Sequence, residues 1–128
     1  MTTDEKVKHW IESSDDDFNT MFLLFKSKKN NWALFMGHIA IEKLLKAYFV
    51  KKNENYPPFT HNLYRLAELC GLEISEERAE WLFKVTTFNI NARYDDYKKE
   101  FYAMCTANFT KEWIEKINKI QQWIKQML

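Results

Sequence analysis

The residues whose types and spacing are best suited to chemistry are His38, Glu42 and Lys46, which repeat every four positions. Positions four apart lie on one face of a helix, so an imidazole, a carboxylate and an ammonium group would share one stripe, with Lys43 beside it. This stripe is the first candidate for a functional site. The simpler interpretation, which we prefer for each residue alone, is a helical ion pair between Glu42 and Lys46 and a hydrogen-bonded histidine at the edge of the core.

A second candidate group lies later in the chain and is centred on Arg93. Arginine is the natural bidentate ligand of a phosphate, although a structural salt bridge would explain Arg93 equally well. The carboxylates that could form this bridge are Asp95, Asp96 and Glu42. Tyr94 could stack on a base, but packing is the default role in a chain with 16% aromatic residues. Two adjacent carboxylates are weak evidence for magnesium, so we predict no metal site.

The stripe lies in a stretch, residues 32–52, whose pattern predicts a helix that is apolar nearly all round. One broad side carries Leu34, Ile41, Leu44, Leu45 and Tyr48, and the opposite side carries Phe35, Met36 and Ile39 near the start. A helix without a wet face is buried. We therefore expect this helix at the centre of a bundle, or between the bundle and a second subunit.

The first part of the chain also predicts a helix. Thr2 and Glu5 fit a capping box that opens a helix reaching about Lys28. Its inner side is expected to carry Val7, Ile11, Phe18, Met21, Phe22 and Phe25. The acidic run at residues 15–17 is interpreted as a solvated face, because consecutive helical positions point 100° apart.

After the central helix, Pro57 and Pro58 forbid further helix. Thr60 can cap a short helix that Gly71 ends. We expect His61, next to Thr60, to fix this loop and the helix start rather than to perform chemistry.

The last third of the chain predicts two or three more helices. Ser75 is the expected cap of a helix with an apolar stripe of Trp81, Leu82, Val85 and Phe88. The polar segment 89–99 interrupts the pattern, and Phe101, Met104 and Cys105 indicate a short helix. Thr110 is the expected cap of a last helix over residues 111–127. With no strand-like alternation, the prediction is a single all-α domain over residues 1–128, an up-and-down bundle of four long helices and one or two short ones.

Composition excludes several classes of function. Nineteen basic and eighteen acidic residues give a net charge of +1, so no overall field attracts a polyanion. The start of the chain lacks a signal peptide and no stretch is a membrane span, so we expect a cytoplasmic protein. Cys70 and Cys105 are expected to be buried free thiols. With only two glycines there is no glycine-rich phosphate loop and no other catalytic signature, so no cofactor is predicted.

Three motifs in order resemble the HEPN domain family. They are His38-x-x-x-Glu42-Lys43-x-x-Lys46-Ala47, then Thr60-His61-x-Leu63-x-x-Leu66 after the proline loop, then Ala92-Arg93-Tyr94. The resemblance covers roughly residues 5–125. It implies an up-and-down helical bundle that usually forms a homodimer with a groove at the interface. Many family members are RNA-cleaving toxins of toxin–antitoxin systems or partners of small nucleotidyltransferases, and others are proposed to bind nucleotides.

The ribonucleases of this family carry an arginine followed, after four to six residues, by a histidine. With Arg93 as the arginine, the positions for that histidine hold Lys98, Lys99 and Glu100. All three histidines of the chain precede its first arginine, Arg65, so the motif exists nowhere. RNA cleavage without a metal needs a base and an acid, for which imidazole is best suited at neutral pH.

Three functional hypotheses follow. The first is a dimeric module that binds nucleotide or RNA, acts with a nucleotidyltransferase partner and has no strong catalysis of its own. Its candidate ligand contacts are Arg93, Lys43, Lys46, Glu42, Tyr94, Asp95 and Asp96. The alternative is a divergent metal-independent ribonuclease that uses Arg93 with His38 or His61. The third is a purely structural dimerisation module.

Overall fold

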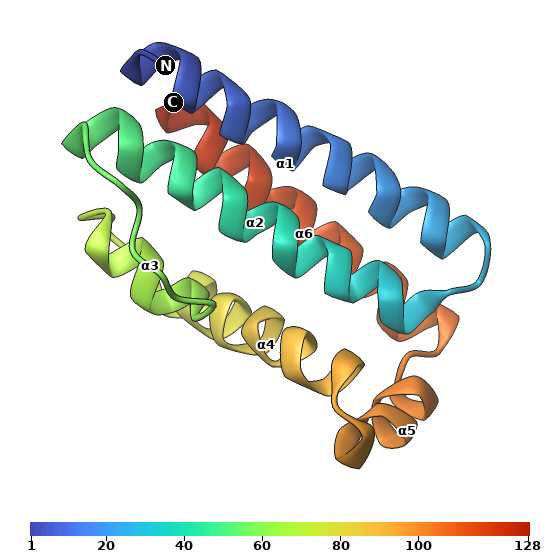
Figure 1. Cartoon of the computed structure of the whole chain (residues 1–128). Coiled ribbons are helices and arrows are strands. Elements are labelled where there is room, and N and C mark those ends of the chain that lie inside the picture. Colours follow the sequence, from blue (N-terminus) through green and yellow to red (C-terminus); the bar gives the residue numbers. More distant parts are fainter.

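The computed structural model describes all residues, 1–128, and consists of six helices without a strand. The helices are α1 (Thr3–Lys26), α2 (Asn30–Asn53), α3 (Leu63–Leu69), α4 (Glu76–Arg93), α5 (Asp95–Met104) and α6 (Ala107–Met127). The four long helices α1, α2, α4 and α6 run alternately up and down, and both termini lie at the same end (Figure 1). The prediction of an all-α bundle with four long and two short helices is confirmed.

Helix α2 is the centre of the bundle, as its apolar pattern predicted. It packs against α1, α3, α4, α5 and α6, and Leu34, Ile41, Leu44 and Leu45 are fully buried. Gly37 allows the closest approach: a Cβ atom there would lie 2.6 Å from Ile117 Cδ1 on α6 and 3.0 Å from Met21 Sδ on α1. Glycine is needed at this position because two helices meet the α2 backbone there.

Two predicted helix caps are confirmed and two are wrong. Thr2 accepts a hydrogen bond from the Glu5 amide, and Ser75 accepts one from the Arg78 amide. The cap of α3 is Asn62 instead of Thr60, whose hydroxyl accepts from the Asn62 amide and shapes the loop. Asn62, two positions after Thr60, is an equally good capping residue and takes the place predicted for Thr60.

The second wrong cap lies at the start of α6. Its cap is Thr106, which accepts from the Phe109 amide at 3.2 Å. Thr110, the predicted cap, is fully buried inside the helix. The helix begins one turn earlier than predicted because Ala107, Asn108 and Phe109 follow a capping residue as good as Thr110.

The predicted interruption at residues 89–99 is wrong as well. Helix α4 continues to Arg93, and α5 starts at Asp95, so only Tyr94 separates them. The buried stripe of α4 continues through Asn89, 4% exposed, and Ala92, fully buried. A polar residue and a small one at core positions concealed the helical period from the sequence pattern.

The inner side of α1 differs from the prediction at its middle. Phe22 is 44% exposed, whereas Ser14 is buried and donates to the Ala40 carbonyl oxygen at 2.7 Å. Of the acidic run, only Asp16 is a solvated residue without a partner. Asp17 is 8% exposed and forms an ion pair with α2, and Asp15 forms one with Lys125 of α6. The run therefore ties α1 to its neighbours.

The two cysteines are buried free thiols, as predicted. Burial raises the pKa of Cys70 to about 11 and that of Cys105 to about 12. Both side chains are therefore protonated and unreactive at neutral pH. Among the helices, none combines the length and apolar character needed to cross a membrane.

Candidate functional site

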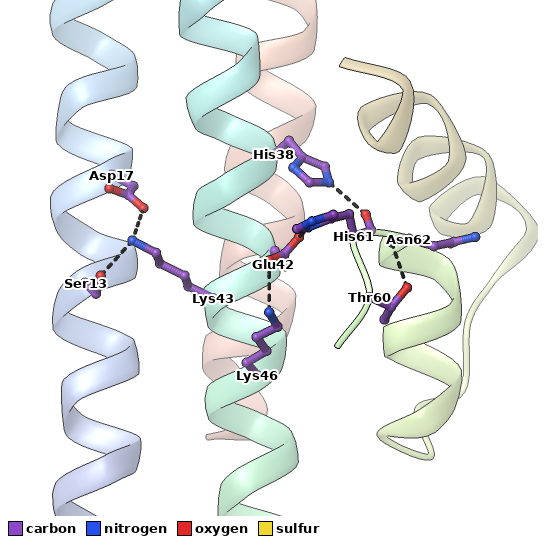
Figure 2. A network of polar contacts seen from close by, with 9 residues as sticks. All are labelled: Ser13, Asp17, His38, Glu42, Lys43, Lys46, Thr60, His61 and Asn62. Atoms are coloured by element: carbon purple, nitrogen blue, oxygen red, sulfur yellow. Dashed lines mark hydrogen bonds and ion pairs between the residues drawn. The ribbon is translucent and has the colours of Figure 1, made fainter. Parts of the chain in front are cut away.

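The polar stripe of α2 is built around the carboxylate of Glu42, whose side chain is only 8% exposed. One carboxylate oxygen accepts a hydrogen bond from Nζ of Lys46 at 3.0 Å, and the other accepts from Nδ1 of His61 at 2.8 Å (Figure 2). The predicted helical ion pair is therefore present, and it is extended by the loop before α3. A buried carboxylate with two charge-assisted partners is held in one orientation.

His38 is fully buried one turn before Glu42 on α2. Its Nε2 lies 2.9 Å from the His61 carbonyl oxygen, which can only accept, so the proton resides on Nε2. Burial lowers the pKa of His38, and the positive charge of Arg93 adds to this, whereas the hydrogen bond to His61 and the carboxylate of Glu42 oppose it. His38 is thus a neutral core residue that positions the loop, and its buried Nδ1 has no partner.

His61 is the exposed member of this network. Its side chain is 52% exposed, and its Nδ1–H donates a hydrogen bond to the carboxylate of Glu42. When the ring is neutral, Nε2 is left as an unprotonated nitrogen that makes no hydrogen bond within the chain. The highly exposed ring of Phe59 lies 5.9 Å from that of His61. A carboxylate-oriented imidazole with a free nitrogen is able to accept a proton from a bound hydroxyl group.

Lys43 is directed away from the other residues of the stripe. Its Nζ lies 2.7 Å from the Asp17 carboxylate and 2.8 Å from the Ser13 hydroxyl, both on α1 (Figure 2). The ammonium of Lys46 lies over the ring of Trp10 at 5.7 Å as well as beside Glu42. The structure therefore separates Lys43 from Lys46, and Lys43 links α1 to α2.

Arg93 is the last residue of α4, and its side chain is exposed. Its Nε donates to the Asn89 carbonyl oxygen at 3.1 Å, and its guanidinium lies 5.9 Å from the ring of Phe35 and 5.4 Å from that of Tyr94. None of the ion pairs of the chain involves Arg93, so the alternative of a salt bridge to Asp95, Asp96 or Glu42 is not formed. The guanidinium Nη atoms remain available to a phosphate.

Asp95 and Asp96 lie in the exposed first turn of α5, where carboxylates stabilise the positive end of the helix. No group of three or more His, Cys, Asp or Glu side chains is placed to hold a metal ion. At the first position where the family's nucleases would carry the histidine stands Lys98. Its Nζ lies 5.0 Å from the ring of Trp32 on α2.

Trp32 and Phe35 are residues of the site that sequence reasoning missed. Together with His38, Glu42 and Lys46 they lie at intervals of three or four along α2 and so occupy one face. Lys98 lies over the ring of Trp32, and Arg93 lies over the ring of Phe35. The aromatic spacing before His38 was visible in the sequence, but only as part of the expected core.

Comparison with family models assigns residues 7–127 to the HEPN domain. No curated protein and no solved structure matches the chain. The matched range contains the whole α2 stripe, the His61 loop and Arg93. This match covers nearly all of the chain and agrees with the helical bundle and with the order of the three motifs, which makes the protein a member of the HEPN domain family.

Proposed function

We propose that the protein is a cytoplasmic HEPN module that binds nucleotide or RNA along the exposed edge of the α2 stripe. The observation that carries this proposal is Arg93, whose guanidinium is supported by two aromatic rings and by Asn89 but has no carboxylate partner. Arginine held in this way is suited to a phosphate, and the 54% exposed ring of Tyr94 is available to a base.

In this proposal the module works without strong catalysis of its own. The nuclease position is taken by Lys98, and an ammonium group donates hydrogen bonds but has no lone pair with which to act as a base. His38 is buried and holds the loop through its only N–H. The family resemblance adds a nucleotidyltransferase as the proposed partner, as in toxin–antitoxin systems.

We also propose that the module is a homodimer. Large apolar side chains other than Tyr94 are exposed on α4 and α5. They are Phe83, Ile90 and Tyr97, which are 51%, 46% and 51% exposed. Exposed apolar surface of this kind is often covered by another protein, which supports a contact between two copies.

Binding of fluorescently labelled RNA and nucleoside triphosphates to the Arg93→Ala variant tests the ligand proposal. We expect affinity to fall by at least about tenfold, because a charge-assisted phosphate contact is removed. Arg65→Ala is the matched control, since Arg65 is exposed and pairs only with Glu68 at 3.6 Å. The absence of RNA and nucleotide binding by the unaltered protein, or a change only in stability for Arg93→Ala, would overturn the proposal in favour of a structural module.

A second candidate function is metal-independent RNA cleavage. The specific observation in its favour is the Glu42–His61 pair, with the His61 Nε2 free on an exposed ring. In this reaction His61 would accept the proton of the ribose 2′-hydroxyl, whose oxygen attacks the adjacent phosphorus. The bond from phosphorus to the 5′-oxygen breaks, water protonates this leaving oxygen, and Arg93 would stabilise the charge on the phosphate.

Cleavage of a mixed-sequence RNA, with and without magnesium, tests the second candidate. Activity lost in both His61→Ala and Arg93→Ala, but retained in the exposed-histidine control His9→Ala, would make the protein a nuclease. No cleavage, or equal cleavage by all variants, would reject catalysis and leave the binding proposal.

A further inference from the structure

We propose that a hollow between the first turn of α2 and α5 is a second phosphate subsite for the RNA strand that contacts Arg93. The hollow has a volume of about 420 Å³ and is lined by Asn31, Asp95, Lys98, Lys99 and Tyr102. This inference rests on the proposed function and narrows its class of ligand to RNA strands with more than one phosphate. A protein with both subsites binds an oligonucleotide in preference to a mononucleotide.

The first turn of α2 has neither a side-chain cap nor an acidic residue. Lys29 at its N-cap makes no side-chain hydrogen bond. The first amide groups of a helix have no partner within it and carry partial positive charge. Asn30 fixes this end of α2, because its Nδ2 donates to the Cys105 carbonyl oxygen at 2.9 Å.

Asn31 provides an independent indication of a ligand. It is only 5% exposed, yet it lines the hollow, and its carboxamide, unlike that of Asn30, makes no hydrogen bond within the chain. The carboxamide is not among the fully buried polar groups that lack a partner, so water or a ligand in the hollow reaches it. A phosphate oxygen in the hollow would accept from its Nδ2.

The charge around the hollow also favours an anion. Lys98 and Lys99 line it, and the turn between α1 and α2 at the same end of the bundle carries the exposed Lys26, Lys28 and Lys29 (Figure 1). None of these lysines takes part in an ion pair. The one carboxylate at the hollow, Asp95, lies in the first turn of α5 and faces the positive end of its own helix.

The hollow and Arg93 are connected by neighbouring aromatic rings on α2. The ring centroids of Trp32 and Phe35 are 5.7 Å apart, with Lys98 over the first and Arg93 over the second. Tyr102, 66% exposed, lies at the rim of the hollow. Trp32 and Phe35 are partly buried against the core and support the two cations, so the rings open to bases are Tyr94 and Tyr102. Cations that meet phosphates, together with exposed rings that stack on bases, are the arrangement that binds single-stranded RNA.

The test is binding of a labelled single-stranded RNA of about 12 nucleotides, within the usual site size, over a series of salt concentrations. Lys98→Gln with Lys99→Gln should weaken binding by at least about tenfold. The slope of log K against log salt should fall by about 0.7 for each phosphate that no longer meets a lysine. The matched control is Lys8→Gln with Lys51→Gln, which removes the same charge at the opposite end of the bundle and should change binding little.

Asn31→Asp is a second variant, nearly identical in shape, that places a carboxylate in the hollow. It should weaken RNA binding as the lysine variant does, whereas binding of a nucleoside monophosphate should change less than about twofold in both variants, because a single phosphate is held at Arg93 alone. If Asn31→Asp fails to fold, the exposed lysine pair still decides the question.

Equal weakening by the hollow variants and the control would overturn the subsite while the proposed function stands, because RNA binding would then depend only on net charge. Mononucleotide binding reduced as strongly as RNA binding would also overturn it, since the hollow would then be the sole phosphate site. RNA binding abolished in Arg93→Ala but unchanged in the hollow variants would confine the ligand to Arg93. The absence of RNA binding by the unaltered protein would overturn both proposals.

Discussion

The polar residues of this protein differ in role according to the neighbour that each one meets. Glu42 and Lys43 are adjacent on α2, yet Glu42 binds the loop before α3 through His61 and Lys43 binds α1 through Asp17. Arg93 meets rings and a carbonyl oxygen but no carboxylate. Glu42 and Lys43 thus join helices and loop within the fold, whereas the guanidinium of Arg93 has no anionic partner in the chain.

His38 predicts a pH dependence of stability at the residue scale. Its pKa in the folded protein is lowered from 6.5, mainly by burial. The unfolded chain therefore binds the proton more readily than the folded protein. The free energy of unfolding has its full value above pH 6.5 and decreases as the pH falls from 6.5 toward the lowered pKa of His38. The decrease should approach about 1.4 kcal/mol per pH unit.

Urea unfolding between neutral and mildly acidic pH measures this decrease. His38→Gln keeps a donor for the His61 carbonyl oxygen but does not titrate, so its free energy of unfolding should depend less on pH. His9→Gln, at an exposed position, should retain the dependence of the unaltered protein. Identical pH profiles for the unaltered protein and His38→Gln would show that His38 is not the group responsible.

At the scale of the helices, local signals identified the elements well and their boundaries less well. The α1 and α4 caps were correct because Thr2 forms a capping box with Glu5 and Ser75 directly precedes the acidic first turn of its helix. The predicted starts of α3 and α6 were wrong because a second capping residue stands within one turn of the predicted one. Which residue becomes the cap depends on where the tertiary contacts allow the helix to begin.

The start of α6 provides the prediction at this scale. Thr106→Ala should lower the free energy of unfolding by about 1 kcal/mol, because the Phe109 amide would have no acceptor. Thr110→Val should leave stability unchanged or raise it, because the buried Thr110 hydroxyl has no partner and valine has the same shape. Urea unfolding of both variants measures the difference. A larger destabilisation by Thr110→Val than by Thr106→Ala would contradict the cap assignment.

For the whole molecule, the surface proposed for the dimer contact is the part of α4 and α5 that carries the exposed Phe83, Ile90 and Tyr97. Arg93 lies beside it, so a second copy bound there would bring two sets of ligand contacts together. The stripe of α2 would then be covered on its α4 side. The proposed dimer and the proposed ligand site are therefore coupled by position.

Ile90→Glu tests this arrangement. A carboxylate in an apolar contact loses its hydration, so the dissociation constant of the dimer should rise by more than about tenfold. Light scattering across a range of concentrations measures it, with Leu23→Glu as the control, since Leu23 is 64% exposed on α1. A monomeric unaltered protein, or an equal effect of the two substitutions, would exclude this surface as the dimer interface.

The sequence by itself determined the helical class, the central place of α2 and the residue types of the site. These depend on local properties: hydrophobic period, capping residues and the positions of charges along one helix. The α4 stripe was predicted only as far as Phe88, because its continuation consists of a polar residue, Asn89, and a small one, Ala92.

Only the tertiary structure decided which polar residues meet. The bond from His38 to the His61 carbonyl oxygen, the diversion of Lys43 to Asp17, the placing of Arg93 over Phe35 and the hollow beside Asn31 all join segments distant in sequence. Such contacts depend on how the helices are turned about their axes when the core packs. The periodicity of one helix does not show which residue of a neighbouring helix its polar side chains will contact.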